Sequence, residues 1–226
     1  MISFSHHDLS PPPAAARKVA PSGARRAYAA RAPLFCEGDE KTSLYEIEQG
    51  CVKLYRTLID GQRQVVGFAT TGDVLGLEPG ARHLNSAEAV NAVRVRAIAT
   101  CQIGELCRRE PGFAEALLHQ AGRQLAAAQM QLAQIGAQTA DQRIAGFLLS
   151  LAEPDAEGPV EIDLPMRRGD IAEFLGLRLE TVSRKFSEFQ RRGWIRLTSL
   201  YHCVLRRPDI LTELAEGGEA PHSEAA

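Results

Sequence analysis

The chain has 226 residues, of which 45% are hydrophobic, and a formal net charge of -2 at pH 7, so it has enough apolar material for two modest globular domains. No apolar run reaches the ~18 to 20 residues that span a bilayer, and no long apolar signal region follows Met1, so we expect a cytoplasmic protein. Five irregularly spaced cysteines argue against a disulfide framework and for a reducing compartment.

Residues 1–30 form the first segment and show neither a helical nor a strand period. They contain Pro11-Pro12-Pro13, repeated alanines and the basic residues Arg17, Lys18, Arg25 and Arg26. Such a composition predicts a disordered basic tail. At the other end, residues 211–226 are expected to form a frayed, mildly acidic tail.

Residues 31–112 are divided by regularly spaced glycines. Gly38, Gly50, Gly61 and Gly72 fall 12, 11 and 11 residues apart. Between such glycines, apolar and polar residues alternate over 44–48 and 52–56, and they alternate again over 93–96. This spacing predicts short antiparallel strands joined by turns, in a β-roll (jelly roll) of the kind used as a sensor domain.

Residues 113–140 carry a long amphipathic helical pattern. Its apolar positions, spaced three and four residues apart, are Leu118, Ala121, Leu125, Ala128, Leu132, Ile135 and Thr139. The spacing is that of the a and d positions of a coiled coil. We predict a dimerisation helix with its seam at Leu118, Ala121, Leu125, Ala128, Leu132 and Ile135. The alternative is that the stripe packs only on the chain's own β-domain.

Residues 141–210 contain two short amphipathic patterns that meet near Gly176. The first places Ile171, Ala172 and Leu175 on one face, and the second places Val182, Phe186 and Phe189 on one face. Two helices joined by a glycine turn predict a helix-turn-helix.

Two short strand-like runs, 193–197 and 200–205, follow the second helix and predict a β-hairpin wing, with Trp194 in the core. The run 160–164 alternates in the same way and is expected to add a strand. The whole chain is therefore predicted to be an α+β protein: an N-terminal antiparallel β-roll, a long dimerisation helix and a C-terminal winged helix-turn-helix.

The solvent face of the second helix carries the candidate functional residues. Glu180, Ser183 and Arg184 lie at i, i+3 and i+4, so an acceptor, a hydroxyl and a guanidinium share one surface. Such groups suit base edges in the major groove. A plain surface ion pair between Glu180 and Arg184 is the alternative. The segment 165–207 holds ten Lys/Arg against four Asp/Glu, which favours DNA, and we expect phosphate contacts from Arg178, Thr181 and Lys185.

The order of these parts resembles the CRP/FNR superfamily of bacterial transcription regulators over residues 31–210. The segments that carry the resemblance are Leu34-Phe35-x-x-Gly38-Asp39-Glu40, Ser43-Leu44-Tyr45, Gly50-x-Val52-Lys53, Gly67-Phe68, Gly72-Asp73, and Arg168-Gly169-Asp170-Ile171 through Glu180-Thr181-Val182-Ser183-Arg184. Ser183 stands where the cyclic-AMP receptor branch usually has Gly, so the chain is closer to the FNR and FixK branch. Lys185 departs from the family, which usually has an apolar residue there.

The resemblance implies a homodimer that binds double-stranded DNA at a TTGAT-type inverted repeat. It further implies an activator that recruits RNA polymerase, with FixK-like control of low-oxygen or respiratory genes. An enzyme is not expected, because Ser, His and Cys are scattered without a nucleophile and base motif.

No cofactor or metal is expected in the β-roll. Where the resemblance implies an Arg-Ser pair and a Gly-Glu pair for a cyclic nucleotide, the chain has Asn85-Ser86 and Gly76-Leu77, with Glu78 and Arg82 displaced by one and three residues. Of the four thiolates that an FNR-type iron-sulfur cluster needs, only Cys101 falls at a matching place. His83 and His119 are interpreted as surface residues rather than haem ligands.

A ligand-gated sensor-regulator of the same superfamily is the alternative function, gated by a cyclic nucleotide or by redox chemistry. For the redox version, Cys36, Cys51 and Cys203 are the candidates, and Cys203 is the one in the predicted wing. The competing interpretation of Cys203 is an inert, half-buried thiol.

Overall fold

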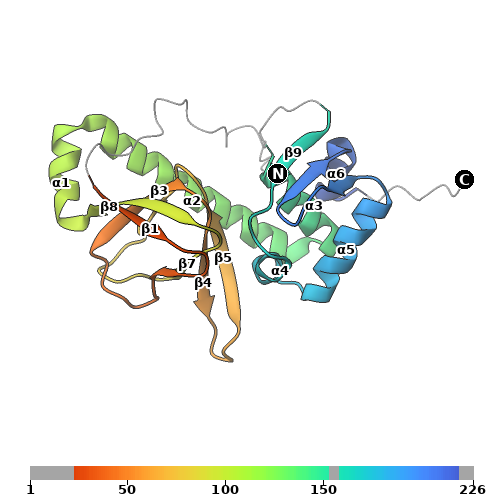
Figure 1. Cartoon of the computed structure of the whole chain (residues 1–226), viewed down its shortest axis with the longest axis horizontal. Coiled ribbons are helices and arrows are strands. Elements are labelled where there is room, and N and C mark those ends of the chain that lie inside the picture. Colours follow the sequence, from red (N-terminus) through yellow and green to blue (C-terminus); the bar gives the residue numbers. More distant parts are fainter. Residues whose placement is uncertain (1–22, 153–157, 219–226) are drawn as a thin grey trace, which may run out of the picture. The chain divides into compact units, whose positions relative to one another are not determined.

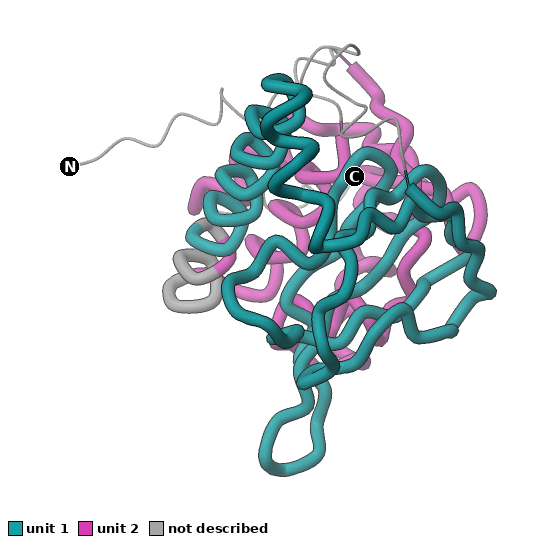
Figure 2. The backbone as a smooth tube through the Cα atoms, turned by 90° about the vertical axis from the view of Figure 1, so that its left-hand side faces the viewer, with its two compact units in different colours: residues 1–129 teal, residues 130–226 magenta. Residues whose placement is uncertain are grey.

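The computed structural model describes residues 23–152 and 158–218, except the side chains of residues 130 and 132–137. The chain divides into two compact units, residues 1–129 and 130–226, which Figure 2 shows in two colours. The long helix α2 (Pro111–Ala137) contributes to both units, and each unit is described by itself.

The first unit is built on two four-stranded antiparallel sheets (Figure 1). One has the strand order β1-β8-β3-β6 and the other β2-β7-β4-β5. The strands are β1 (Ala24–Tyr28), β2 (Pro33–Phe35), β3 (Ser43–Gln49), β4 (Val52–Thr57), β5 (Arg63–Ala69), β6 (Val74–Leu75), β7 (Ser86–Ala89) and β8 (Val93–Ala99). This architecture confirms the predicted β-roll.

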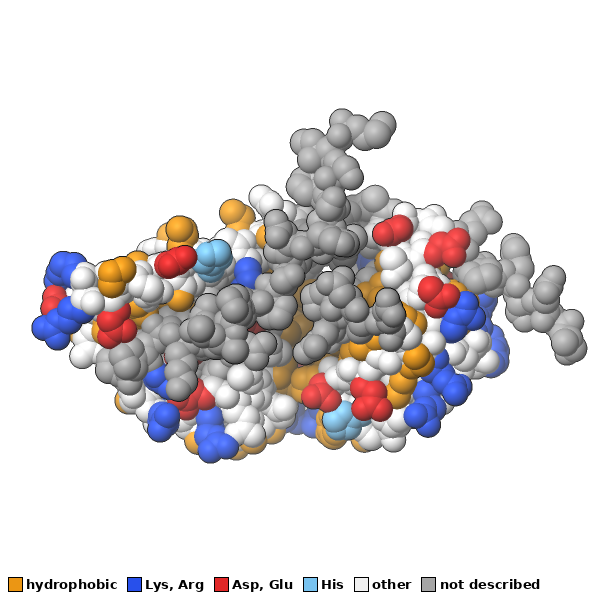
Figure 3. Space-filling model, turned by 90° about the horizontal axis from the view of Figure 1, so that it is seen from above, with side chains coloured by type: hydrophobic (Ala, Val, Ile, Leu, Met, Phe, Trp, Pro, Cys, Tyr) orange, Lys and Arg blue, Asp and Glu red, His pale blue; other side chains and the backbone are white. Residues whose placement is uncertain are grey.

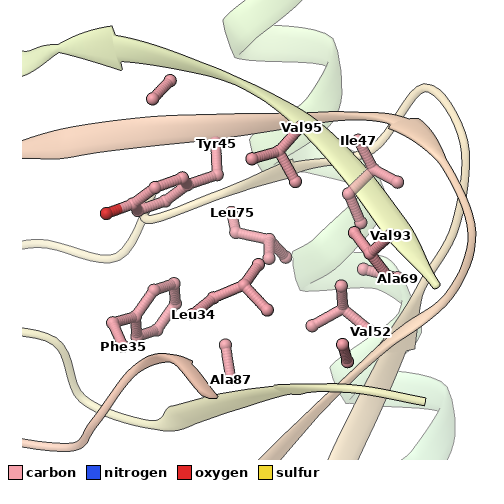
Figure 4. Packing of buried hydrophobic residues seen from close by; sticks show 12 residues of the cluster. Leu34, Phe35, Tyr45, Ile47, Val52, Ala69, Leu75, Ala87, Val93 and Val95 are labelled. Atoms are coloured by element: carbon pink, nitrogen blue, oxygen red, sulfur yellow. The ribbon is translucent and has the colours of Figure 1, made fainter. Parts of the chain in front are cut away.

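The core of the roll lies between the two sheets, where the labelled side chains of Figure 4 point toward one another. Strand β8 shows how the sequence produces this core. Val93 and Val95 are fully buried, and the arginines that alternate with them lie on the other face of the strand. The alternation in the sequence therefore marks the two faces of the sheet correctly.

The turn between β3 and β4 requires glycine. Gly50 has φ 95°, and a Cβ atom there would lie 2.5 Å from the carbonyl oxygen of Ala92. Any L side chain would be strained in that conformation and would also collide with the backbone.

The predicted disordered tail is wrong from Ala24 onward, because β1 pairs with β8 along its whole length, from Ala24 opposite Ala97 to Tyr28 opposite Val93. A polar edge strand needs only backbone hydrogen bonds to its neighbour, so its own sequence carries little strand period. Residues 1–22 lie outside the described part of the chain.

Helix α1 (Thr100–Arg109), which was not predicted, follows β8 directly. Its Ile103 and Leu106 pack against a cluster that contains Phe113, the buried residue at the start of α2. The predicted helix 113–140 corresponds to α2, with a new helix beginning at Ala140.

The second unit contains a small antiparallel sheet and four further helices (Figure 1). In chain order the elements are α3 (Ala140–Ser150), β9 (Val160–Asp163), α4 (Arg168–Leu175), α5 (Leu179–Arg191), β10 (Ile195–Leu197), β11 (His202–Leu205) and α6 (Pro208–Ala215). The sheet order β10-β11-β9 confirms both the hairpin wing and the strand expected upstream. Trp194 is buried, with its ring centroid 5.2 Å from that of Phe189, as predicted.

The predicted C-terminal tail 211–226 is wrong at its start. Leu211 and Leu214 are buried in α6, which begins with Pro208 and packs against α3. Pro at the first helical position followed by apolar residues three apart was an available helix signal. Within the described ranges, no helix is both long and apolar enough to cross a membrane.

Candidate nucleic-acid interface

The helix-turn-helix depends on the turn at Gly176. This residue ends α4 in the left-handed conformation, with φ 64° and ψ 37°. The backbone N–H of Leu177 then donates to the carbonyl oxygen of Ala172 at 3.0 Å, which closes the helix end. The chain thereby reverses within a few residues, and α5 begins at Leu179.

Helix α5 has one buried face and one exposed polar face. Val182, Phe186 and Phe189 are at most 2% exposed and hold the helix in the core. Glu180, Ser183 and Arg184 are exposed on the other side. Within the described residues no ion pair joins Glu180 to Arg184, so these two groups are available to an external partner.

Arg178 and Thr181 lie at the start of α5. Arg178 is the exposed residue that precedes the helix, and Thr181 is half-buried in the first turn. The N-terminus of a helix favours anions, because its first backbone N–H groups are unpaired within the helix. Both residues therefore lie where a phosphate group would be stabilised.

The second unit carries several exposed arginines, on α5 and elsewhere. They are Arg167, Arg178, Arg184, Arg191, Arg196, Arg206 and Arg207. Figure 3 shows blue Lys and Arg side chains gathered on this unit, at the right of that view. A local positive surface in a chain of slightly negative net charge is what binding to a phosphate backbone requires.

Lys185 does not project freely from α5. Its Nζ lies 2.7 and 2.8 Å from the two carboxylate oxygens of Asp141 on α3, and 3.1 Å from Glu188 Oε2. Its side chain is only 19% exposed. This arrangement argues against the predicted phosphate contact, because the ammonium group is already neutralised within the protein.

Two arginines support the helix-turn-helix through contacts that no local sequence pattern indicates. The Arg168 guanidinium lies 3.6 Å from the centroid of the Phe186 ring and covers it. Arg143 Nη1, from α3, donates to the carbonyl oxygen of Leu175 at 3.0 Å. The capping box of Thr139 and Gln142 indicates in the sequence that α3 starts at Ala140. It does not indicate the contacts of Arg168 and Arg143.

The predicted dimer seam is exposed wherever its side chains are described. Leu118 and Leu125 are 74% and 60% exposed, and Ala121 and Ala128 are exposed beside them. The side chains of Leu132 and Ile135 lie outside the described part.

A different face of α2 packs on the β-roll of the first unit. Phe113 is buried there, and the side-chain amides of Gln120 and Gln124 donate to the carbonyl oxygens of Gly72 and Val74 at 2.6 and 2.7 Å. The alternative in which the seam residues pack on the chain's own β-domain is therefore wrong for the described positions.

The five cysteines are free thiols, and they differ in access. Cys36 and Cys101 are exposed, whereas Cys203 is buried in β11. Burial raises the pKa of the Cys203 thiol to about 11, although the charge of Arg168 and a backbone hydrogen bond at Arg196 oppose that rise. Both features work against the redox role considered for Cys203, because the reactive form of a thiol is the accessible thiolate.

We expect Cys203 to resist alkylation by iodoacetamide at pH 8 in the native protein, while Cys36 and Cys101 react. Peptide mass spectrometry at successive times would measure each rate, and unfolding the protein in denaturant should make all five cysteines react. Modification of native Cys203 as fast as Cys36 would contradict this expectation.

Polar residues close to the positions compared with a cyclic-nucleotide pocket make contacts within the chain. His83 is buried, which corrects its interpretation as a surface residue: its ring stacks on Phe35 at 3.6 Å, and its Nδ1 lies 2.9 Å from Glu78 Oε1. Arg82 donates to the carbonyl oxygen of Gly38 at 2.7 Å, and Lys41 donates to that of Glu78. His119 is exposed, as predicted. Among the described residues, no group of three or more His, Cys, Asp or Glu is placed to hold a metal ion.

Comparisons with known proteins match both units. A Crp-like helix-turn-helix domain matches residues 142–214, and a cyclic nucleotide-binding domain matches residues 25–110. The nitrogen fixation regulation protein FixK of Bradyrhizobium diazoefficiens is 38% identical over 176 residues, which cover 76% of this chain and 74% of that protein. The fumarate and nitrate reduction regulatory protein of Escherichia coli is 30% identical over 187 residues, covering 80% and 74%. The structure of FixK2 from Bradyrhizobium japonicum superimposes with a TM-score of 0.78 at 31% identity, covering 85% of this chain and 97% of that one.

The matched helix-turn-helix domain and the relatives, which are transcription regulators, identify the chain as a DNA-binding transcription regulator rather than an enzyme. The chain belongs to the CRP/FNR family of transcription regulators, in its FixK-like branch.

Proposed function

We propose that the protein binds a TTGAT-type inverted repeat as a homodimer and activates transcription by recruiting RNA polymerase, in FixK-like control of low-oxygen or respiratory genes. Such a role places it in the cytoplasm. The observation that carries the proposal is the exposed group of Glu180, Ser183 and Arg184 on one face of α5, within a basic surface. The relatives support the direction of the proposal, since they are named as regulators of nitrogen fixation and of fumarate and nitrate reduction.

The three side chains suit distinct base edges. Arg184 can bind O6 and N7 of guanine with two hydrogen bonds, Glu180 can accept a hydrogen bond from N4 of cytosine, and Ser183 can pair with either kind of edge. Arg178 and Thr181, at the start of α5, are assigned to neighbouring phosphates. The specificity for base sequence and the register of the protein on the DNA are thus assigned to different residues.

Dimerisation is supported by the exposed leucines of α2. An unpartnered stripe containing Leu118 and Leu125 is costly in water, and a second copy of the helix would cover it at the heptad spacing. Alanines at the intervening positions would let the two helices approach closely. Two recognition helices related by a two-fold axis would then read the two halves of an inverted repeat.

We assign a largely structural role to the β-roll, because His83, Arg82 and Lys41 are bound to groups of the protein itself. Selection of bound sequences from a random DNA pool, with purified cofactor-free protein, tests target, symmetry and ligand independence together. We expect TTGAT-type inverted repeats. Enrichment of an unrelated or asymmetric sequence, or binding only after a cyclic nucleotide is added, would overturn the proposal.

Replacement of Arg184 by alanine is expected to cost about 1 to 3 kcal/mol in specific binding and to relax the preference at one base position. The affinity for the palindrome and for its single-base variants, measured by fluorescence anisotropy, gives both quantities. Arg178→Ala is the matched control, because loss of a phosphate contact weakens binding to all sequences alike and lowers the salt slope by about 0.9 per site. If Arg184→Ala bound the palindrome as tightly as the wild type does, Arg184 would not be one of the residues that contact bases.

A further inference from the structure

Lys185 is one of the places where this chain departs from its family, and its contacts give a reason for a charged residue there. The residue lies directly after Arg184 on α5, yet its side chain points back into the protein. Both carboxylate oxygens of Asp141 contact its ammonium group, and Glu188 contacts it from the next turn of α5. An apolar side chain at this position could make none of these contacts.

The partner residue, Asp141, belongs to the first turn of α3, and that turn touches both helices of the helix-turn-helix. Asp141 binds Lys185 on α5, while Arg143, two residues further on, binds the carbonyl oxygen of Leu175 at the end of α4. Arg143 also donates to the carbonyl oxygen of Gln138, before α3 begins. One short stretch of chain therefore contacts both helices of the helix-turn-helix.

The ion pairs are partly shielded from water. Lys185, Asp141 and Glu188 have side chains that are 19, 25 and 20% exposed. Burial lowers the pKa of Lys185, but hydrogen bonds and charges from the two carboxylates outweigh it and leave that pKa above its usual value. The pKa of Glu188 is lowered, chiefly by its hydrogen bond to Lys185 and also by Arg192, whose Nη2 lies 2.8 Å away.

We propose that Lys185 is a positioning residue of the DNA-reading site: through Asp141 it fixes the rotation of α5 about its axis, and so presents Glu180, Ser183 and Arg184 to the bases. A helix turns by about 100° per residue, so a tether at position 185 fixes the direction of the neighbouring side chain at 184. Small rotations there move a guanidinium away from hydrogen-bond distance of a base edge. The inference rests on the proposed function of α5.

A phosphate contact by Lys185 would behave differently in two measurable ways. It would contribute to binding of any DNA sequence, and its loss would make the logarithm of affinity fall less steeply with salt, by about 0.9 per protomer. A positioning residue contributes to specific binding only. Asp141→Asn separates the two roles by the direction of its effect. It would leave Lys185 with the Glu188 carboxylate alone, which makes a phosphate contact easier, but it would release the tether of α5 to α3.

The experiment compares wild type with Lys185→Met, Lys185→Arg and Asp141→Asn, on the selected palindrome and on unrelated DNA over a range of salt concentrations. Met keeps the length of the side chain without the charge, and Arg keeps the charge. Glu213→Gln on α6 is the matched control for Asp141→Asn, since it removes an exposed carboxylate from the same unit. Thermal unfolding of each variant establishes that the second unit is folded at the assay temperature.

We expect Lys185→Met and Asp141→Asn each to weaken palindrome binding about tenfold, which corresponds to ~1.4 kcal/mol. Binding to unrelated DNA and the salt slope should stay at wild-type values, and Lys185→Arg should restore most of the lost affinity. The double variant Lys185→Met with Asp141→Asn should be no weaker than either single variant, because both remove the same interaction.

The inference is overturned if Asp141→Asn binds the palindrome as tightly as wild type or more tightly. It is also overturned if Lys185→Met weakens binding to unrelated DNA to the same extent as binding to the palindrome. Failure of the wild-type protein to select a palindrome would instead overturn the proposed function, so the two failures are distinguishable.

Discussion

The double substitution Leu118→Glu with Leu125→Glu is expected to make the protein monomeric and to lower its affinity for the palindrome by roughly 10²- to 10⁴-fold, the range by which paired binding sites exceed single ones. Both leucines are exposed in the described chain, at 74% and 60%, and neither is among the residues by which α2 contacts the β-roll. Four carboxylates facing one another across a two-helix seam would repel, while each winged helix would stay intact.

Sedimentation equilibrium measures the association, and anisotropy with a half-site and with the full palindrome measures the binding. The matched control is Leu58→Glu with Leu84→Glu, which changes two leucines that are also exposed, at 47% and 48%, but lie in the β-roll. We expect the control to remain dimeric. A dimer of undiminished affinity in the α2 variant would show that the seam lies elsewhere.

Phe186→Ala is expected to destabilise the winged-helix unit by about 3 to 5 kcal/mol, the usual cost of truncating a buried phenylalanine. Phe186 is 2% exposed, and it anchors α5 in the core while the Arg168 guanidinium covers its ring. Its loss leaves a cavity and removes a cation–π contact, which adds to the cost. Phe186→Leu, which fills most of the same volume, is expected to cost much less.

Trp194 provides a local readout for this prediction. It is the single tryptophan of the chain, and it lies in the second unit beside Phe189. Its fluorescence during urea unfolding therefore follows the winged helix and not the β-roll, which avoids treating a two-unit chain as one transition. An unchanged midpoint for Phe186→Ala would contradict the packing described for α5.

Elements whose residues carry a strong local period were predictable from sequence. The alternation in β8, the two amphipathic helices around Gly176 and the hairpin that follows Trp194 are all set by neighbours in the chain. Strand β1 was not predictable in this way. It is a polar edge strand whose existence depends on backbone hydrogen bonds to β8, about 70 residues away, and no local pattern encodes that distance.

The same distinction applies to the candidate site. The exposed face of α5 follows from helical spacing, so the sequence alone is enough to group Glu180, Ser183 and Arg184. His83 was misassigned, and the ion pairs of Lys185 were not foreseen, because their partners are distant or lie on other elements. Asp141 is 44 positions from Lys185, and the ring under His83 belongs to Phe35. The local sequence around a charged side chain or an imidazole does not reveal which group contacts it in the folded protein.

The two glutamine amides that fasten α2 to the β-roll are electrically neutral. Gln120 and Gln124 bind backbone carbonyl oxygens, so neither salt nor a change of pH within the working range weakens these two contacts by screening or titration. Arg123 of α2 also pairs with Asp73 at 3.3 Å, and salt screens that ion pair, so the two glutamine amides are the contacts expected to hold α2 on the roll when ionic strength is raised. A salt titration of DNA binding is expected to report mainly on charges that contact phosphate. It can therefore distinguish the arginines that contact the DNA backbone from those that read the bases.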